Sequence, residues 1–150
     1  MNMSATAAGF SVLMIAAGIG IPIMAALNGV LGARLGSPPL ASLIVFVVGA
    51  AVSLAALLVT GWPGKPAAAI PPQYFFGGVF VAFYALSITY AAPRIGVGNA
   101  VMFVLLGQLI AAAAIDHFGL MGAIRSPITV QRAIGIAFMV VGVVLARKVV

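Results

Sequence analysis

Cysteine is absent from this 150-residue sequence, which also contains a single acidic residue, Asp116, and a single histidine, His117. Without cysteine, the chain can form neither a disulfide nor a thiolate metal site. One carboxylate and one imidazole are too few for a metal-binding cluster, and no nucleophile can be paired with a general base. We therefore expect no metal, no cofactor, no catalytic residues and no enzymatic activity.

Charge is nearly as scarce as cysteine. Charged side chains make up 5% of the residues, whereas 65% are hydrophobic, and the mean hydropathy is +1.32. Because so little polar surface cannot cover a soluble globule, the sequence predicts an all-α integral membrane protein surrounded by the lipid bilayer. The net charge of +6 comes from lysines and arginines that are dispersed between the apolar stretches. A nucleic-acid-binding surface would need them concentrated, so we expect no nucleic-acid partner.

Apolar stretches dominate what the sequence does contain. A helix needs roughly 20 residues to cross the hydrocarbon core, and five stretches approach or exceed that length. Turn-forming segments separate them, among them the proline-rich Gly61–Pro72, which carries Trp62 and Lys65 at the expected depth of the lipid headgroups. We expect a single transmembrane domain over residues 1–150, a bundle of five helices, with spans at about 7–33, 40–60, 73–92, 96–115 and 129–146.

Small residues recur along the expected helices and predict close helix packing. Counting about 100° per residue, they share a narrow arc of the first helix: Ser11, Gly18, Ala25, Gly29 and Gly36. A similar stripe runs along the second helix: Ser42, Gly49, Ser53, Ala56 and Thr60. We expect its hydroxyls to bond to their own backbone, with a solute-lining role as the alternative. Pro22 follows two glycines and predicts a kink or break in the first helix, as in ordinary packing or at a transporter site.

Four polar side chains lie at membrane depth within these spans: Asn28, Tyr84, Asn99 and Gln108. Amide and phenol groups in hydrocarbon need hydrogen-bond partners, so we expect these residues to bind substrate. Asn99 and Gln108 are nine positions apart, which places them on opposite sides of one helix. One amide can therefore bond to a packing neighbour while the other faces a central site.

Asp116 and His117 end the fourth expected span, and Arg125 lies in the polar turn that follows. Two interpretations are equally supported. Asp116 can form an interfacial ion pair with Arg125, which would be structural. Alternatively, Asp116 and His117 can exchange protons with water and couple transport to a proton gradient.

Three segments carry a family resemblance: AALNGVLGARLGSPPLAS at the end of the first span, APRIG at the end of the third, and GQLIAAAAIDHFGLMG in the fourth. Together they resemble the YdcZ-like family of the drug/metabolite transporter superfamily, over nearly the whole chain. The resemblance implies a multi-pass protein of the bacterial inner membrane, similar to half of a ten-helix member. The small multidrug resistance proteins of that superfamily use a glutamate in their first helix. The first span here has no acidic residue, so their mechanism does not carry over.

Polar residues on several spans, together with the resemblance, favour a secondary transporter subunit that moves a small organic solute by alternating access. Because no acidic residue lies in the bilayer interior, we expect a neutral or amphipathic solute. The alternative is a non-transporting membrane subunit that stabilises or escorts a partner protein, since the same glycine faces would serve assembly alone.

The cations give the chain almost no preferred orientation. Five spans place Lys65, Arg125 and Arg132 on one side of the membrane, and on the other side lie Arg34, Arg94, Arg147 and Lys148. Because such cations orient a membrane protein, this balance permits both insertions. Five helices are few to enclose a solute pathway, so we expect an antiparallel dimer, of identical chains or with a close relative, joined through glycine faces such as Gly135 and Gly142.

Overall fold

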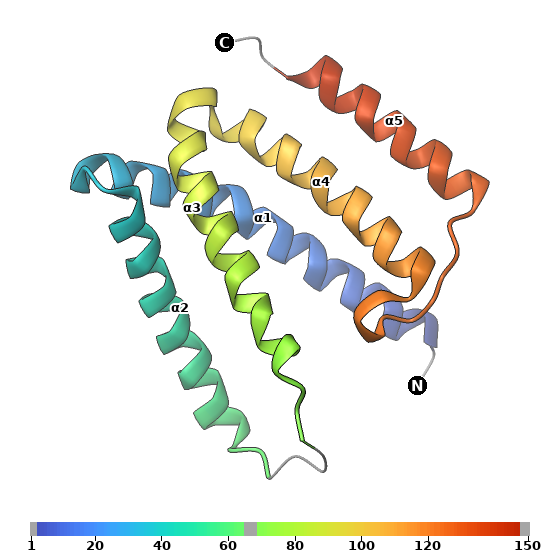
Figure 1. Ribbon diagram of the computed structural model, residues 1–150, viewed down its shortest axis with the longest axis horizontal. Helices are drawn as coiled ribbons and strands as arrows, with labels where there is room; N and C mark the ends of the chain where they lie inside the picture. Colours follow the sequence, from blue (N-terminus) through green and yellow to red (C-terminus); the bar gives the residue numbers. More distant parts are fainter. Residues whose placement is uncertain (1–2, 65–68, 148–150) are drawn as a thin grey trace. The chain divides into compact units, whose positions relative to one another are not determined.

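A computed structural model describes residues 3–64 and 69–147 of the chain. These residues form helices and contain no strand, so the predicted all-α class is confirmed (Figure 1). Five α-helices are accompanied by two short 3-10 helices. In chain order the elements are α1 (Met3–Leu35), α2 (Pro38–Thr60), η1 (Pro72–Phe76), α3 (Gly77–Ile95), α4 (Val97–Phe118), η2 (Leu120–Gly122) and α5 (Val130–Ala146).

Four helical segments are long and apolar enough to cross a membrane: Ala7–Leu35, Pro38–Thr60, Pro72–Ile95 and Val97–Phe118. The third of them joins η1 to α3. The remaining helix, α5, has 17 residues, which is at the short end of the range for a membrane-spanning helix. Each expected span overlaps one α-helix, and the chain is an integral membrane protein with several spans. That α5 crosses the membrane stays a prediction.

Helix α1 runs unbroken through Pro22, so the predicted break in the first helix is absent. Proline removes one backbone donor, and the other hydrogen bonds of this 33-residue helix keep it continuous. The argument for a transporter site at a broken helix therefore does not apply to Pro22.

A compact turn joins α1 to α2. Gly36 ends α1 with a φ of 63°, a conformation that glycine adopts without the steric cost of a Cβ atom. The Ser37 hydroxyl then caps α2 by accepting a hydrogen bond from the Leu40 N–H at 3.3 Å, and Pro38 begins the helix. Because the turn is this short, α1 and α2 lie in contact next to it.

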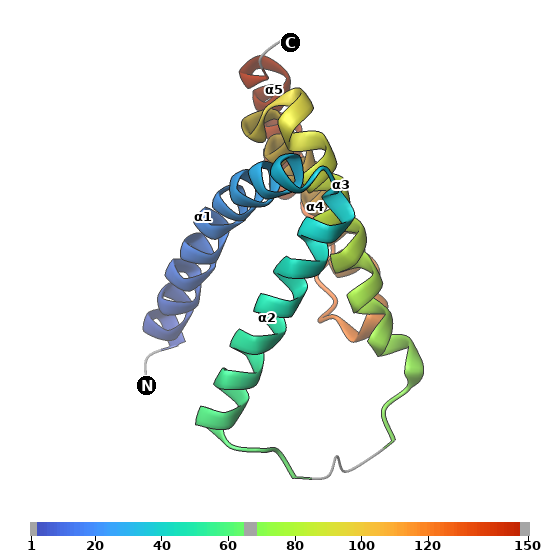
Figure 2. The same ribbon diagram turned by 90° about the vertical axis from the view of Figure 1, so that its left-hand side faces the viewer.

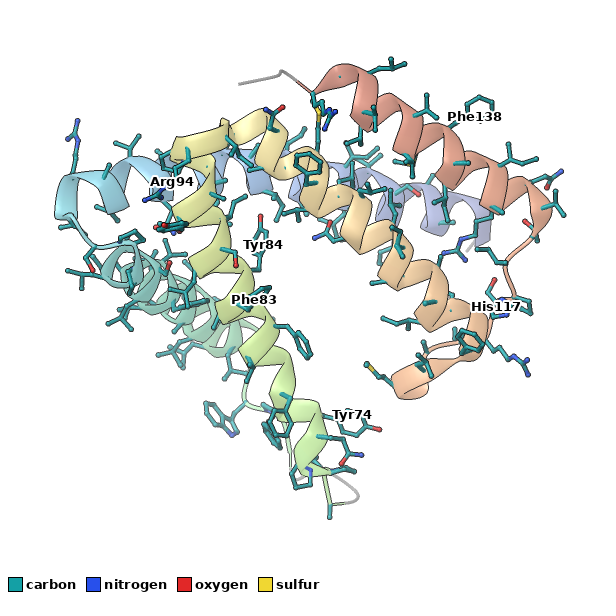
Figure 3. The ribbon with its side chains drawn as sticks, turned by 45° about the horizontal axis from the view of Figure 1, so that its top comes forward. Tyr74, Phe83, Tyr84, Arg94, His117 and Phe138 are labelled. Carbon is teal, nitrogen blue, oxygen red and sulfur yellow. The ribbon has the colours of Figure 1, made fainter. Side chains whose placement is uncertain are left out.

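The chain forms two compact units, Met1–Arg94 and Ile95–Val150. In the first, α1, α2 and α3 converge near the Gly36 turn and spread apart towards their other ends (Figure 2). In the second, α4 and α5 pack as an antiparallel pair (Figure 1). Large apolar side chains such as Phe83 and Phe138 are 71% and 73% exposed, as expected of helices that face lipid (Figure 3).

Candidate functional site

Three polar side chains meet where α1, α2 and α3 converge. Asn28 comes from α1, Ser42 from α2 and Thr89 from α3, and each is only 1% exposed. The Asn28 side-chain amide donates a hydrogen bond to the Thr89 hydroxyl. The Ser42 hydroxyl lies 3.3 Å from the Thr89 hydroxyl and 3.3 Å from the Ala85 carbonyl oxygen. We call these three residues the three-helix junction.

The hydrogen bonds of the junction share one direction around the Thr89 hydroxyl. A hydroxyl has one proton, and the Thr89 hydroxyl donates its proton to the Ala85 carbonyl oxygen at 2.6 Å. The oxygen of Thr89 acts as an acceptor towards Asn28, whose Nδ2 faces it. This leaves Oδ1 of Asn28 turned away from Thr89. Oδ1 is buried and has no hydrogen-bond partner among the residues described.

Two glycines of α1 allow α3 to approach closely enough for these bonds. A Cβ atom on Gly32 would lie 3.0 Å from Cγ2 of Thr89, and one on Gly29 would lie 3.2 Å from Cγ of Pro93. Both distances are tighter than ordinary van der Waals contact. The predicted use of glycine for close approach therefore holds at Gly29. At Gly18, on the same predicted face, a Cβ would meet nothing within 4 Å in the described structure.

A cavity of about 420 Å³ lies between α1 and α2, next to the junction. Its walls are formed by aliphatic side chains such as Ile23, Leu27, Ile44 and Val48. Among the residues that line it, Asn28 has the only polar side chain. The cavity therefore combines an apolar interior with one amide, which is the usual composition of a site for a small organic molecule.

A second cavity, of about 370 Å³, is lined by Thr89, the hydrogen-bond partner of Asn28. It is lined by Thr89 and Arg94 and by the glycines of the α1 end, including Gly32 and Gly36. The Arg94 guanidinium donates to the Tyr90 carbonyl oxygen and lies over the Tyr90 ring, 3.5 Å from its centroid (Figure 3). Asn28 lines the first cavity and Thr89 the second, so their hydrogen bond joins a residue of each.

Tyr84, a predicted binding residue, lies on α3 directly before Ala85 in the sequence (Figure 3). Its hydroxyl oxygen is buried and has no hydrogen-bond partner in the described structure. It lines neither of the two cavities described above. Its role in binding stays a prediction.

The other two predicted binding residues, Asn99 and Gln108, lie on α4 in the second unit. The Asn99 amide donates a hydrogen bond to the Ile95 carbonyl oxygen at 3.0 Å, at the start of its own helix. Gln108 is exposed. Asn99 therefore has a local structural contact, and the binding roles of both residues stay predictions.

Asp116 forms its ion pair with Arg132, at 2.7 Å, and not with Arg125 as one interpretation of the sequence proposed. Both partners are partly exposed, 36% and 37% by side chain. The connector after α4 explains the difference, because it folds back onto the helix end. Ser126 N–H donates to the Asp116 carbonyl oxygen at 2.8 Å, which brings the first turn of α5 beside the carboxylate. Arg125 is exposed and forms no ion pair among the described residues.

His117 takes part in the same connection. Its Nδ1 accepts a hydrogen bond from the Ile128 N–H at 3.0 Å, near the end of α4 (Figure 3). An accepting Nδ1 carries no proton, so the neutral ring holds its proton on Nε2. Asp116 and His117 thus both hold the connector in place, and proton coupling through them stays a prediction.

The sequence did not single out Thr89 and assigned Ser42 a different contact. Ser42 was expected to bond to its own helix, as Thr60 does through the Ala56 carbonyl oxygen at 2.9 Å. Instead it bonds across to α3. One signal could have indicated Thr89. It lies four residues after Ala85 and three before Ala92, and residues at these spacings share one face of a helix, which is the buried face of α3.

Two expectations fall on residues outside the described ranges. Lys65, expected at headgroup depth, and Lys148, counted among the orienting cations, are both in this group. Trp62, the aromatic neighbour of Lys65, is 76% exposed, which suits a side chain at a membrane surface.

Comparison with known proteins identifies the family of this chain. Residues 9–145 match the family described as "Putative inner membrane exporter, YdcZ". No curated protein and no solved structure matched the chain. The match extends from the first expected span to the last and agrees with the four long apolar helices. This multi-pass inner membrane protein therefore belongs to the YdcZ family, as its sequence segments predicted.

Proposed function

We propose that this chain is a subunit of a secondary transporter that exports a small neutral or amphipathic organic solute by alternating access. The family description supports export across the inner membrane. The observation that carries the proposal is the cavity between α1 and α2, which is apolar except for the buried amide of Asn28. A polar group at membrane depth is costly, and it is most often found where a solute or ion passes.

The geometry of the first unit supports movement of its helices. Hydrogen bonds and glycine contacts hold α1, α2 and α3 together at the junction, whereas the helices spread apart at their other ends (Figure 2). Helices that are fixed at one end can rock about that end with little loss of packing. Such rocking is the motion by which one bundle alternately opens to the two sides of a membrane.

A neutral or amphipathic solute suits the charges on the chain. The only acidic side chain, Asp116, lies at the end of α4 and is paired with Arg132. The cavity between α1 and α2 is lined by no charged side chain. A cation in it would lose its hydration without gaining a counter-charge, so strong selection for cations is disfavoured.

We propose that the transporter is an antiparallel dimer, of identical chains or with a close relative. Gly135 and Gly142 on α5 support this assembly, because a Cβ on either would meet nothing within 4 Å in the described structure. An open glycine face permits close approach by another helix. Two units in opposite orientations would form an inverted repeat around a site at mid-membrane.

Export can be tested in two stages. Mass spectrometry of the medium first identifies organic solutes that leave cells expressing the wild-type chain faster than cells expressing Asn28→Leu at equal membrane levels. Each solute is then loaded into proteoliposomes that contain only this protein. Efflux faster than from protein-free liposomes, and slowed by Asn28→Leu, supports the proposal. Efflux no faster than from protein-free liposomes would exclude transport by this chain alone and would leave a heterodimer with a close relative or a non-transporting subunit that escorts a partner.

A further inference from the structure

We propose that Oδ1 of Asn28 is the specificity-determining atom of the cavity between α1 and α2. It selects solutes in which an uncharged hydrogen-bond donor, a hydroxyl or an amide N–H, is attached to an apolar body. This inference rests on the proposed export function and names the class of solute. Three observations support it: the buried acceptor without a partner, the direction of the hydrogen bonds at Thr89, and the apolar lining of the cavity.

The three-helix junction favours one orientation of the Asn28 amide, with Nδ2 towards Thr89 and Oδ1 away from it. If the amide turned over, the Thr89 hydroxyl could donate to Oδ1 only by giving up its hydrogen bond to the Ala85 carbonyl oxygen at 2.6 Å. The amide nitrogen would also lose the acceptor that it has now. Asn28 therefore keeps Nδ2 on Thr89 and holds Oδ1 free as an acceptor. A ligand that can only accept hydrogen bonds gains nothing from it.

A buried acceptor without a partner is a feature that needs an explanation. Most buried polar side-chain atoms in proteins have at least one hydrogen-bond partner. Here the unpaired oxygen belongs to the only polar side chain that lines the cavity. A solute donor would satisfy it. Lipid acyl chains, the other molecules available at this depth, carry no donor and would leave it unpaired.

The remaining lining determines the rest of the solute. Aliphatic side chains from both helices surround the cavity, and at about 420 Å³ it falls within the size range of small-molecule sites. No lining side chain carries charge, so an ionised solute would be desolvated without compensation. Met24 also lines the cavity, and its unbranched side chain can adapt to the shape of a solute.

The test uses two probes that differ in one group: 4-fluorobenzyl alcohol, whose hydroxyl donates a hydrogen bond, and its methyl ether, in which a methyl group replaces the hydroxyl hydrogen so that the oxygen only accepts. Fluorine NMR titrations of the full chain in nanodiscs measure binding, and protein-free nanodiscs correct for partition into lipid. We expect saturable binding of the alcohol, about tenfold tighter than that of the ether, because one hydrogen bond is worth roughly this factor.

Variants separate the role of Oδ1 from general packing. Asn28→Leu keeps an apolar cavity and is expected to abolish the preference for the alcohol. Thr89→Ser keeps the hydroxyl and preserves the preference, whereas Thr89→Val frees the amide to turn over and reduces it. Thr60→Val is the matched control, because the Thr60 hydroxyl bonds only to its own helix on the exposed side of α2. It should leave the preference unchanged.

Three outcomes would overturn the inference. Equal affinity for alcohol and ether in the wild-type chain, or an unchanged preference in Asn28→Leu, would show that Oδ1 does not select the solute. Absence of saturable binding of either probe would show that the cavity is filled by lipid or by a second copy of the chain. If Thr89→Val fails to fold, the comparison of Asn28→Leu with Thr89→Ser still shows whether Oδ1 selects the solute. Binding that follows the predicted order without any export would leave this inference standing and overturn the proposed function.

Discussion

The side-chain amide of Asn28 on α1 donates a hydrogen bond to the hydroxyl of Thr89 on α3, 61 residues further along the chain. This bond joins residues that line two different cavities of the first unit, and it ties together helices that spread apart towards their other ends (Figure 2). One interhelical contact thus contributes to both stability and a candidate solute site. The predictions below separate these two contributions.

Loss of the Thr89 hydroxyl should destabilise the protein. Thr89→Val leaves the buried amide nitrogen of Asn28 without an acceptor, at a cost of about 1–3 kcal/mol. This exceeds the average of about 0.6 kcal/mol for interhelical hydrogen bonds in membranes, because a partner is removed and the donor stays buried. Reversible unfolding in mixed micelles, followed by circular dichroism, measures the change. Thr60→Val is the control, and an equal loss in both variants would contradict the assignment.

Added side-chain volume at Gly32 should also destabilise the first unit. A Cβ there lies 3.0 Å from Cγ2 of Thr89 and 3.4 Å from the backbone of Pro38, so Gly32→Ala pushes α1 away from its neighbours. Gly18→Ala has open space and should be neutral or stabilising by up to about 1 kcal/mol, since alanine favours helix over glycine. Unfolding free energies of the two variants test this. A stable Gly32→Ala protein with unchanged export would argue against the tight contact.

Transport should respond differently to the two amides predicted to bind solute. Asn28→Leu removes the only polar side chain that lines the α1–α2 cavity, so export should fall at least tenfold at normal membrane levels. Gln108→Leu is expected to reduce export as well if Gln108 faces the solute pathway. Efflux assays on both variants, normalised to the amount of inserted protein, separate the roles. Normal flux in both variants would show that neither Asn28 nor Gln108 binds the solute.

Asp116 should couple energetically to Arg132 and not to Arg125. A partly exposed ion pair contributes about 0.2–1 kcal/mol, so Asp116→Asn should cause a small loss of stability. A double-mutant cycle with Arg132→Gln should give a coupling energy of this size, and a cycle with Arg125→Gln should give none. The pH profile of export tests the proton role. A profile that shifts in Asp116→Asn at unchanged stability would replace the structural role with proton coupling.

The dimer can be tested by labelling, because the chain contains no cysteine that would give a background signal. Single cysteines at Ser4 and at Val150, each in a separate variant, are labelled from outside the cell. An antiparallel homodimer should show partial labelling at both positions, since copies insert in both orientations. Labelling at one position alone would exclude dual insertion and leave a heterodimer with a close relative.

Which parts of the structure could be predicted depended on how local the responsible interactions are. Helix positions follow from apolar length and from turn residues, so α2 and α4 lie within a few residues of their expected ranges. Asn28 could be identified because any amide in hydrocarbon needs a partner. Its partner could not, because the choice of Thr89 depends on how α1 and α3 are aligned, which no short segment encodes.

The ion pair illustrates the same limit on a smaller scale. Sequence proximity suggested Arg125 as the partner of Asp116, whereas the folded connector brings Arg132 there instead. The decisive contacts are two hydrogen bonds, from Ser126 N–H to the Asp116 carbonyl oxygen and from Ile128 N–H to the His117 ring. Backbone N–H groups occur in almost every residue, so the amino-acid types give little indication of which ones form such contacts. Ser42 was mispredicted for a related reason, since a hydroxyl on a helix has its own backbone as a ready alternative.

The pairing of Asp116 with Arg132 has an electrostatic consequence for the lipids around the protein. It uses the only acidic side chain in the sequence, so the six other lysines and arginines have no carboxylate side chain of this chain as a counterion. Their counter-charges must come from outside the polypeptide, and anionic phosphate headgroups lie at the same depth as these interfacial cations. We therefore expect the lipid headgroups to serve as the counterions of the chain, and the anionic lipid content to affect how firmly the membrane holds the protein.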